Sequence, residues 1–372
     1  MRIVQICPRY YPYVGGVENH VKKISERLAA KGFNVTVLTT DPSGQLPRNE
    51  EINGVKVERF PVFAPNQTIF FSRSLHKILK GLKADIIHAH GYQALTMLSV
   101  AMSKSYNRIE YITTLHLGFS KIGKWVYSFY NPIFGRYIFD GAAKIVIVSP
   151  ATLSSIPLLS KYKGKIEYIP NGVDIFKIDS CLKKYGHSFD DKRLRIVSVG
   201  RLEKKKGLGV FIEALRRMED KGLCLHVIGE GPYEKVLRGT LSNLSCKFEI
   251  KFFGRVSDEE LFRNYAQSDI FVLLSEYESH SIALTEAMGF GLVPIVSNVG
   301  GNPYVVAQGV NGFLLEYPIE IQDLVDVLLL LRENREMLRK MSQNAKDTAR
   351  ERFDLENTVE ALERVYNECS RS

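Results

Sequence analysis

Short apolar runs alternate with longer amphipathic stretches along this chain, and the same scheme occurs in both halves. Apolar runs of this length, bounded by glycine or polar residues, are typical of strands buried in a parallel sheet. The first half predicts strands at Ile3–Cys7, Val35–Thr39, Asp85–Ala89, Tyr111–Leu115 and Ile145–Ser149. The second half predicts strands at Leu194–Val199, Leu225–Ile228, Phe248–Phe253, Ile270–Leu274 and Val293–Ser297.

Helical periodicity fills several of the intervals between these strands. In the first interval, Val17, Val21, Ile24 and Leu28 form one apolar helix face, which Gly32 ends. Strands and helices that alternate in this way form parallel sheets with helices on both faces. The predicted fold class is therefore α/β, with two doubly wound, Rossmann-like domains.

One polar segment divides the chain. Phe176–Lys192 is poor in apolar residues, so we interpret it as a linker between an N-terminal domain over residues 1–175 and a C-terminal domain over residues 193–354. A last helical stretch, over about residues 355–372, follows a turn at Phe353 and Asp354.

Composition agrees with two ordinary domains and limits the partners. The 372 residues are 45% hydrophobic and 24% charged, which is enough for two cores. The chain has no run of about eighteen apolar residues and does not begin with a signal-peptide pattern, so we expect a cytoplasmic protein. The five cysteines include no C-x-x-C pair and predict neither a zinc site nor disulfides. The net charge of +9 favours anionic partners: nucleotides, nucleic acid or acidic lipid.

The stretch SEYESHSIALTEAMGFGLVPIVSNVGG predicts a helix start between two glutamates. Glu278 precedes the helix and can hydrogen-bond sugar hydroxyls, whereas Glu286, about two turns in, can bind two ribose hydroxyls. The first N–H groups of such a helix point at an incoming anion, which predicts a diphosphate site. The residues around this helix start are Ser279, His280, Ser281 and Ile282.

Two further turns after predicted strands carry glycines or cations. Gly15 and Gly16 open the first helix, where they either let backbone approach a ligand or form a tight turn with positive φ. Arg201 and Lys206 follow the first strand of the second half, in VGRLEKKKGLG. Two cations at the carboxyl end of a strand suit a leaving diphosphate, whose negative charge grows as the sugar bond breaks.

Taken in order, the motifs GGVEN, TTLH, IPNGVD, GRLxxxKG, GEGP, FGRV, E-x7-E and NVGG span nearly the whole chain. In these motifs the chain resembles the retaining glycosyltransferases of family GT4, which have the GT-B fold. The resemblance implies two domains that face each other across a cleft, with the last helix crossing back to the N-terminal domain. It also implies that Arg201 and Lys206 hold the leaving diphosphate and that His116, in TTLH, lies beside the donor sugar. His280 departs from many relatives, which leaves the sugar specificity open.

The predicted site requires no metal. The chain contains no D-x-D pair to hold a metal on the diphosphate, and no G-x-G-x-x-G turn typical of nicotinamide or flavin dehydrogenases. We therefore expect no cofactor beyond the nucleotide-diphosphate sugar, which is the substrate. The predicted catalytic residues are His116, Arg201, Lys206 and Glu278. The predicted donor-binding residues are Gly15, Gly16, Arg201, Lys206, Glu278, Ser279, His280, Ser281, Ile282 and Glu286.

Aromatic and basic residues are interleaved between Phe119 and Phe139, where the cations are Lys121, Lys124 and Arg136. Rings and cations on one surface suit contact with an anionic membrane, because rings sit at headgroup level and cations meet anionic lipid. The same rings can equally belong to a helical hairpin packed into the N-terminal core. Both interpretations stay open at this point.

The resulting hypothesis is a hexosyltransferase that retains anomeric configuration. It moves a hexosyl or N-acetylhexosaminyl group from a UDP- or GDP-type sugar to a lipid-linked or saccharide acceptor, in the cytoplasm or peripherally on the cytoplasmic membrane face. One alternative is a soluble small-molecule acceptor, and another is a non-catalytic nucleotide-sugar-binding protein. No nucleic-acid partner is expected, because no RRM or OB pattern accompanies the aromatic residues.

Overall fold

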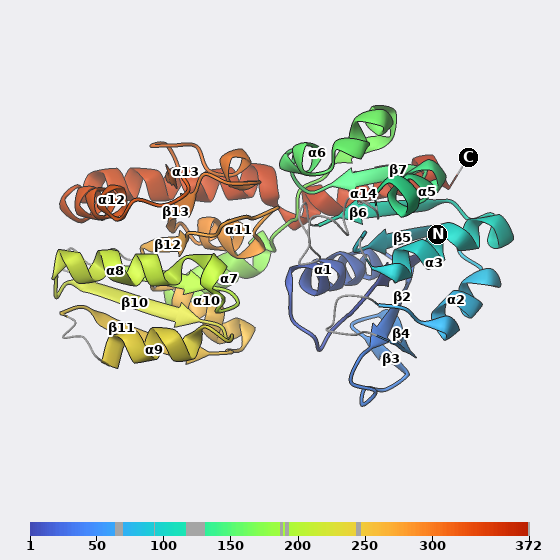
Figure 1. Ribbon diagram of the computed structural model, residues 1–372, viewed down its shortest axis with the longest axis horizontal. Helices are drawn as coiled ribbons and strands as arrows, with labels where there is room; N and C mark the ends of the chain where they lie inside the picture. Colours follow the sequence, from blue (N-terminus) through green and yellow to red (C-terminus); the bar gives the residue numbers. More distant parts are fainter. Residues whose placement is uncertain are drawn as a thin grey trace. The chain divides into compact units, whose positions relative to one another are not determined.

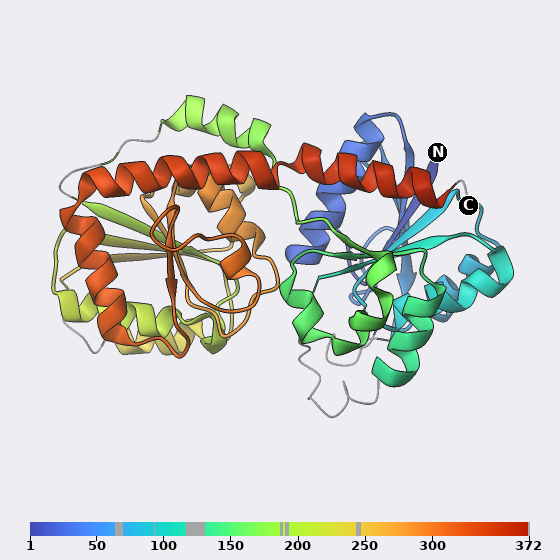
Figure 2. The same cartoon turned by 90° about the horizontal axis from the view of Figure 1, so that it is seen from above.

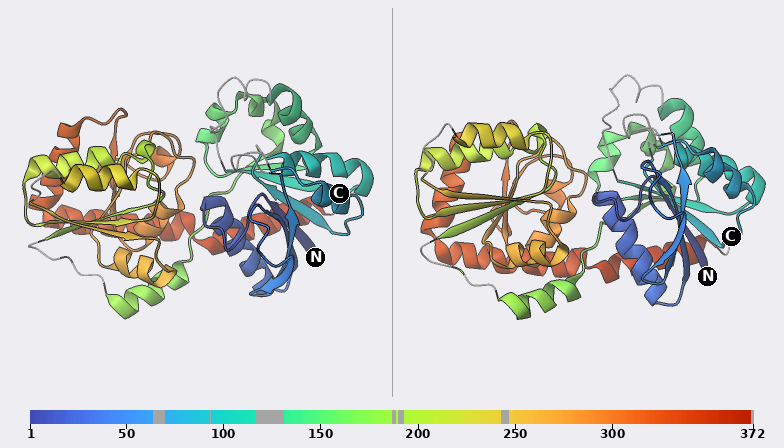
Figure 3. Two further views of the ribbon diagram at one scale, coloured as in Figure 1. Left: turned by 60° about the horizontal axis from the view of Figure 1, so that its bottom comes forward. Right: turned by 90° about the horizontal axis from the view of Figure 1, so that it is seen from below.

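The computed structural model describes residues 1–63, 70–92, 94–116, 131–186, 189, 193–242 and 247–370. These residues form two compact units (Figure 1). The first joins Met1–Asn171 to Leu355–Ser372, and the second comprises Gly172–Asp354. Each unit has its own sheet between layers of helices (Figure 3).

The first unit is built on an eight-stranded sheet in the order β3-β4-β2-β1-β5-β6-β7-β8. Neighbouring strands are parallel except β3, which pairs antiparallel with β4. The strands are β1 (Arg2–Cys7), β2 (Asn34–Asp41), β3 (Asn49–Ile52), β4 (Val55–Pro61), β5 (Ile86–His90), β6 (Tyr111–Leu115), β7 (Lys144–Ile147) and β8 (Ile166–Tyr168). The helices are α1 (Gly16–Ala30), α2 (Arg73–Lys80), α3 (Leu95–Asn107), η2 (Asn131–Gly135), α5 (Arg136–Gly141), α6 (Ala151–Ser155), η3 (Pro157–Lys165) and α14 (Leu355–Cys369).

Alternation along the strands gives this sheet two apolar faces. Ile3 packs with α1 and α14, whereas its neighbour Val4 packs with α2, α3 and α5 on the other face. Helix α14 thus completes the core of the first unit although it is the last element of the chain.

The second unit has a six-stranded parallel sheet in the order β11-β10-β9-β12-β13-β14. The strands are β9 (Leu194–Val199), β10 (Leu223–Ile228), β11 (Glu249–Gly254), β12 (Ile270–Leu273), β13 (Val293–Ser297) and β14 (Phe313–Leu315). The helices are α7 (Ile175–Tyr185), η4 (Lys204–Lys206), α8 (Leu208–Met218), α9 (Glu234–Ser242), α10 (Asp258–Ala266), α11 (Ile282–Gly289), η5 (Asn302–Tyr304), α12 (Ile321–Glu333) and α13 (Arg335–Phe353). Helices α8, α9 and α12 cover one face, and α7, α10, α11 and α13 cover the other.

The ten predicted strands are confirmed within a few residues at their ends, and the α/β class is confirmed with them. The hairpin β3–β4 was not predicted. Its turn at Asn53 and Gly54 has φ of 50° and 80°, the geometry that an Asn-Gly pair favours, so the signal was present. The three-residue edge strands β8 and β14 also escaped prediction, since so few residues carry little pattern.

The interpretation of Phe176–Lys192 as a linker is wrong for residues 176–185, which form most of α7. Asp174 caps this helix by accepting a hydrogen bond from the Lys177 N–H at 3.0 Å. Ile175 and Ile178 are buried against α11 and α13. An ion pair between Asp179 and Arg350 joins α7 to α13, beside which it lies (Figure 2). A short helix that buries only one narrow stripe needs few apolar residues. Its composition therefore resembles that of a linker, which is why the helix was not predicted.

Most of the aromatic and basic segment, residues 117–130, lies outside the described residues. The part that follows them divides between core and surface. Phe139 is fully buried and stacks on Tyr92, with ring centroids 4.9 Å apart. Phe134 and Tyr137 are 39% and 48% exposed. No helix within the described ranges is long and apolar enough to cross a membrane.

Candidate active site

The turn after β9 carries both predicted cations of the second unit. Gly207 ends the turn with φ of 73°, and a Cβ at this position would meet the carbonyl oxygen of Leu274 at 2.1 Å. Glycine therefore lets the turn lie directly against the end of β12. Arg201 and Lys206 line the same small cavity at the carboxyl end of the strand.

Lys206 forms an ion pair with Glu278, the first glutamate of the E-x7-E pattern. Its Nζ lies 2.5 Å from Glu278 Oε1, and the hydroxyl of Ser275 donates to the same oxygen at 2.7 Å. The two side chains are only 27% and 13% exposed, so the contact is largely screened from water. The structure thus brings together two predicted site residues that are far apart in the sequence.

Arg201 is more open to solvent than Lys206. Its side chain is 60% exposed and pairs with Glu203, with 3.3 Å between Nη1 and Oε1. Ion pairs of exposed side chains contribute little to stability, so an incoming diphosphate can compete for this guanidinium at small cost. The backbone beside Glu278 is fixed instead: its carbonyl accepts a hydrogen bond from the Gly301 N–H at 2.8 Å, within the NVGG turn.

Helix α11 begins where the sequence predicted. Ser281 is the N-cap, and its hydroxyl accepts a hydrogen bond from the Leu284 N–H at 3.3 Å. Ser279 is buried, and its hydroxyl has no hydrogen-bond partner among the described protein groups. Glu286 lies in the second turn and is 8% exposed. Apart from the capped Leu284, the first N–H groups of this helix have no acceptor within the helix and can face an anion near the Lys206–Glu278 pair.

Two of the predicted donor-binding residues have an additional structural explanation. The His280 ring packs edge-on against Phe353, with centroids 5.3 Å apart, which gives this departure from the family pattern a packing role. Gly15 has an extended φ of −175°, so the alternative of a turn with positive φ is wrong. A Cβ on Gly15 would lie 2.4 Å from Glu18 Oε2, and this carboxylate is buried in an ion pair with Arg9.

In the first unit, His116 follows β6 and joins a buried hydrogen-bond network. Its Nε2 lies 3.0 Å from His90 Nδ1, and His90 Nε2 lies 2.8 Å from the side-chain oxygen of Gln5. The amide of Gln5 donates to the hydroxyl of Tyr366, on α14, at 3.1 Å. The same hydroxyl lies 2.6 Å from His88 Nδ1. A second contact, 2.6 Å from His88 Nε2 to the hydroxyl of Thr114, holds both ring nitrogens of this fully buried side chain inside the first unit.

Burial keeps two histidines of this network, His88 and His90, neutral. It lowers the pKa of His88 to about 3 and lowers the pKa of His90 well below its ordinary value, with neighbouring imidazoles adding to both effects. Sequence reasoning missed Gln5, His20 and Tyr366. His20 stands three residues after Val17 on the apolar face of α1, and this spacing could have revealed that it is buried.

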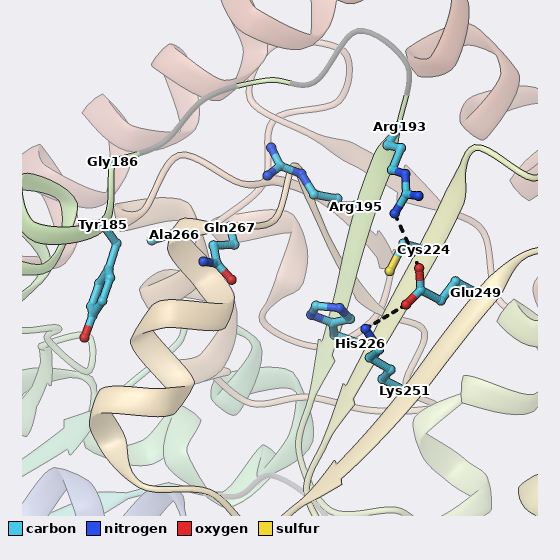
Figure 4. A pocket seen from close by; sticks show the side chains of 10 residues that line it. All are labelled: Tyr185, Gly186, Arg193, Arg195, Cys224, His226, Glu249, Lys251, Ala266 and Gln267. Carbon is cyan, nitrogen blue, oxygen red and sulfur yellow. Dashed lines mark hydrogen bonds and ion pairs between the residues drawn. The ribbon is translucent and has the colours of Figure 1, made fainter.

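The second unit also has a wider hollow, of about 320 Å³, at the opposite end of its sheet (Figure 4). It is lined by Arg193 and Arg195 on β9 and its approach, by Lys251 and Glu249 on β11, and by the last residues of α7 and α10. Glu249 pairs with both Arg193 and Lys251, at 3.5 and 2.7 Å. No predicted site residue lies in this hollow.

Two family models match this chain, one over most of each unit. The model of glycosyltransferase family 4 matches residues 14–176, and the model of glycosyl transferases group 1 matches residues 183–348. This chain belongs to glycosyltransferase family 4.

Related proteins agree over nearly the full length. N-acetyl-alpha-D-glucosaminyl L-malate synthase of Bacillus anthracis is 26% identical over 97% of this chain and 96% of its own. Alpha-monoglucosyldiacylglycerol synthase of Acholeplasma laidlawii is 25% identical over 93% of this chain and 92% of its own. Together with the two family models, these relatives support the assignment of this family 4 chain as a glycosyltransferase.

A solved structure shares the fold. Anabaena HepE in complex with UDP matches with a TM-score of 0.80 and 19% identity, over 99% of this chain and 100% of HepE. The two Rossmann-like units of the family 4 chain are those of the GT-B fold.

Proposed function

We propose that this family 4 enzyme transfers a hexosyl or N-acetylhexosaminyl group from a nucleotide-diphosphate sugar to a lipid-linked or saccharide acceptor, with retention of anomeric configuration. The observation that carries the proposal is the Lys206–Glu278 contact beside Arg201 and the start of α11. Cations, a helix N-terminus and a hydroxyl-binding carboxylate at one sheet edge are what a sugar diphosphate needs.

The chemistry of this edge suits departure of a nucleoside diphosphate. Arg201 and Lys206 would stabilise the negative charge that grows on the leaving phosphate oxygens. The N–H groups at the start of α11 would add fixed partial positive charge. Glu278 would bind hydroxyls of the sugar, and the buried Glu286 would bind the ribose. His116 would act near the reacting carbon.

We also propose that transfer needs no bound metal. The charges that face the donor phosphates in this arrangement come from side chains and a helix end, which removes the need for a divalent bridge. Activity should persist in excess EDTA, and added Mg²⁺ should change the rate only modestly by screening the diphosphate. Complete loss of activity in EDTA, reversed by Mg²⁺, would contradict this part of the proposal.

The relatives support the acceptor classes without choosing between them. The name of one relative includes a diacylglycerol product, and that of another includes malate. A lipid-linked or saccharide acceptor is our proposal, and the malate-named relative favours a small soluble acceptor as the second candidate. HepE was solved with UDP, which supports a uridine donor as the first to test.

The test is a donor panel. Hydrolysis and transfer should be assayed with UDP-, GDP- and ADP-sugars in EDTA, and the anomeric configuration of the product should be read by NMR. Turnover of one donor class with a retained anomer supports the proposal. Binding of a nucleotide sugar without turnover of any donor or acceptor would favour the non-catalytic alternative, and an inverted product would reject retention.

A further inference from the structure

Three buried histidines converge at the carboxyl end of the first unit's sheet. His20 comes from α1, His90 from the end of β5, and His116 from the position after β6. One ring nitrogen of each lies within 4.8 Å of those of the other two. Their residues are 4%, 1% and 9% exposed. Such convergence from three separate elements is fixed by the fold rather than by local sequence.

The hydrogen bonds of Gln5 decide which nitrogen His90 presents to this cluster. Because the Gln5 amide nitrogen donates to Tyr366, its oxygen faces His90 Nε2, which must therefore carry the ring hydrogen. A neutral His90 then has its lone pair on Nδ1, the nitrogen that lies 3.0 Å from His116 Nε2. An imidazole that donates its remote N–H to a carbonyl oxygen is oriented as metal-ligating histidines are.

We propose that His20, His90 and His116 form a site for a single transition-metal ion of the Zn²⁺ type, and that occupation of this site inhibits the enzyme. Neutral imidazole nitrogens suit Zn²⁺, Co²⁺, Ni²⁺ and Cu²⁺, whereas Mg²⁺ prefers oxygen ligands. Ligands at about 2.0–2.1 Å from a tetrahedral Zn²⁺ lie roughly 3.3 Å apart, close to the separation already present between His90 and His116. Three ligands leave a fourth position open.

Coordination follows simply from the hydrogen-bond pattern. The metal takes the lone pair of His90 Nδ1 and one ring-nitrogen lone pair from each of His20 and His116. Coordination by neutral imidazoles changes no oxidation state, so no oxidant, reductant or further reactant is required. The inhibitory part rests on the proposed function, because it holds His116 in a metal complex and away from the reacting carbon.

Binding can be measured without any activity. Tag-free protein, stripped with EDTA and dialysed, should be titrated with Zn²⁺ and Co²⁺, with the metal content measured by atomic absorption. We expect one equivalent per chain and a cobalt visible spectrum of tetrahedral nitrogen ligation. His20→Gln and His90→Gln should each weaken Zn²⁺ binding at least tenfold. His76→Gln, on α2 and outside the cluster, is the matched control and should bind as the unchanged protein does.

Several outcomes would overturn the site. They are the absence of stoichiometric binding to the unchanged protein, equal weakening in His76→Gln, and a sulfur-to-cobalt charge-transfer band, which would place the ion on cysteine. The spectrum of the unchanged protein decides the matter even if both cluster variants fail to fold, which thermal unfolding would show.

Inhibition is tested separately with the best donor. Zn²⁺ should lower turnover of the unchanged enzyme, EDTA should restore it, and His20→Gln should require at least tenfold more Zn²⁺ for the same fractional loss relative to its own metal-free rate. Stoichiometric binding without inhibition would reject the inhibitory role alone. Absence of any transferase activity would reject the proposed function and leave the binding result unaffected.

Discussion

The two ends of the strands in the second unit's sheet differ in a way that supports the position proposed for the donor site. We call the amino ends of the parallel strands the amino edge of the sheet. The wider hollow, about 320 Å³, lies there, with Arg193, Arg195 and Lys251 on its wall. At the carboxyl ends of the strands, the carboxyl edge, the hollow is small and is lined by Arg201 and Lys206. Cations are present at both edges, so positive charge does not separate them, and the wider hollow contains none of the predicted site residues.

Helix direction and charge pairing separate the two edges. The amino edge receives the C-terminal ends of α7 and α10, whose carbonyl groups repel an anion. Its Arg195 is already bound to the fully buried Asp269, at 3.0 Å. The carboxyl edge receives the N-terminus of α11 and an exposed Arg201. The comparison favours the carboxyl edge as the proposed diphosphate site, because a helix N-terminus there is attractive to an anion.

The largest expected effect comes from the cations at the carboxyl edge. Arg201→Ala or Lys206→Ala removes one charge-assisted contact to the leaving diphosphate, so kcat should fall by about tenfold to a hundredfold. Arg193→Ala and Lys251→Ala remove comparable, exposed cations from the amino edge and should change kcat less than about twofold. Steady-state kinetics with the best donor measures both. Equal losses of kcat in the variants of the two edges would contradict a donor site at the carboxyl edge.

The two glutamates should differ in what they bind. Glu286→Gln should weaken free UDP or GDP by about tenfold, because the ribose is common to donor and product. Glu278→Gln should leave free-nucleotide affinity nearly unchanged and reduce discrimination between donor sugars. Calorimetry with the free nucleotide gives the first result, and competition between two donor sugars gives the second. Similar losses of nucleotide affinity in both variants would reject this division of roles.

At the amino edge, His226 should make stability depend on pH. Burial lowers its pKa, and Lys251 and Arg195 act in the same direction, while a hydrogen bond to Asn264 and the charge of Glu249 oppose them. As the pH falls, His226 is therefore protonated in the unfolded chain before it is protonated in the folded protein. The free energy of unfolding that it contributes above about pH 6.5 is lost as the pH falls toward the pKa of His226 in the folded state.

Urea unfolding at about pH 7.5 and about pH 5.5 tests this dependence. The midpoint of the unchanged protein should fall more between these values than that of His226→Gln, because the variant lacks the titrating group and the other ionisable groups are common to both. His76→Gln, on helix α2 of the first unit, provides a control. Identical shifts in all three proteins would remove His226 as a cause.

The smallest expected effect is weak binding of the protein to anionic membranes. Phe134 and Tyr137 are partly exposed beside Arg136, so we propose weak peripheral contact with anionic lipid by this part of the first unit. Co-sedimentation with anionic vesicles should fall with added salt, and also when Lys121, Lys124 and Arg136 are changed together to Ser, since each cation contributes about 1 kcal/mol. Lipid binding that is equal with neutral vesicles, or absent altogether, would favour a soluble acceptor.

The local sequence pattern was sufficient to predict the elements that carry the candidate site residues. Strand periodicity located the ends of β6, β9 and β12. The polar residues Ser279, His280 and Ser281 before an apolar stripe predicted the start of α11, and the structure shows that Ser281 is the N-cap. These features depend on residues close together in the chain, and for that reason they can be predicted. The helix α7 was missed because its burial depends on two isoleucines and on Arg350, which lies far along the chain.

Local pattern predicted the alternation of strands and helices and the motif order that resembles family 4. It also predicted that Arg201, Lys206, Glu278 and Glu286 follow predicted strands or lie in a predicted helix. The contacts of Lys206 with Glu278, of His280 with Phe353, and of Tyr366 on α14 with Gln5 and His88 became visible only in the folded chain. Periodicity indicates which face of an element is buried. The partner on that face is chosen by sheet order and by close packing between elements distant in sequence.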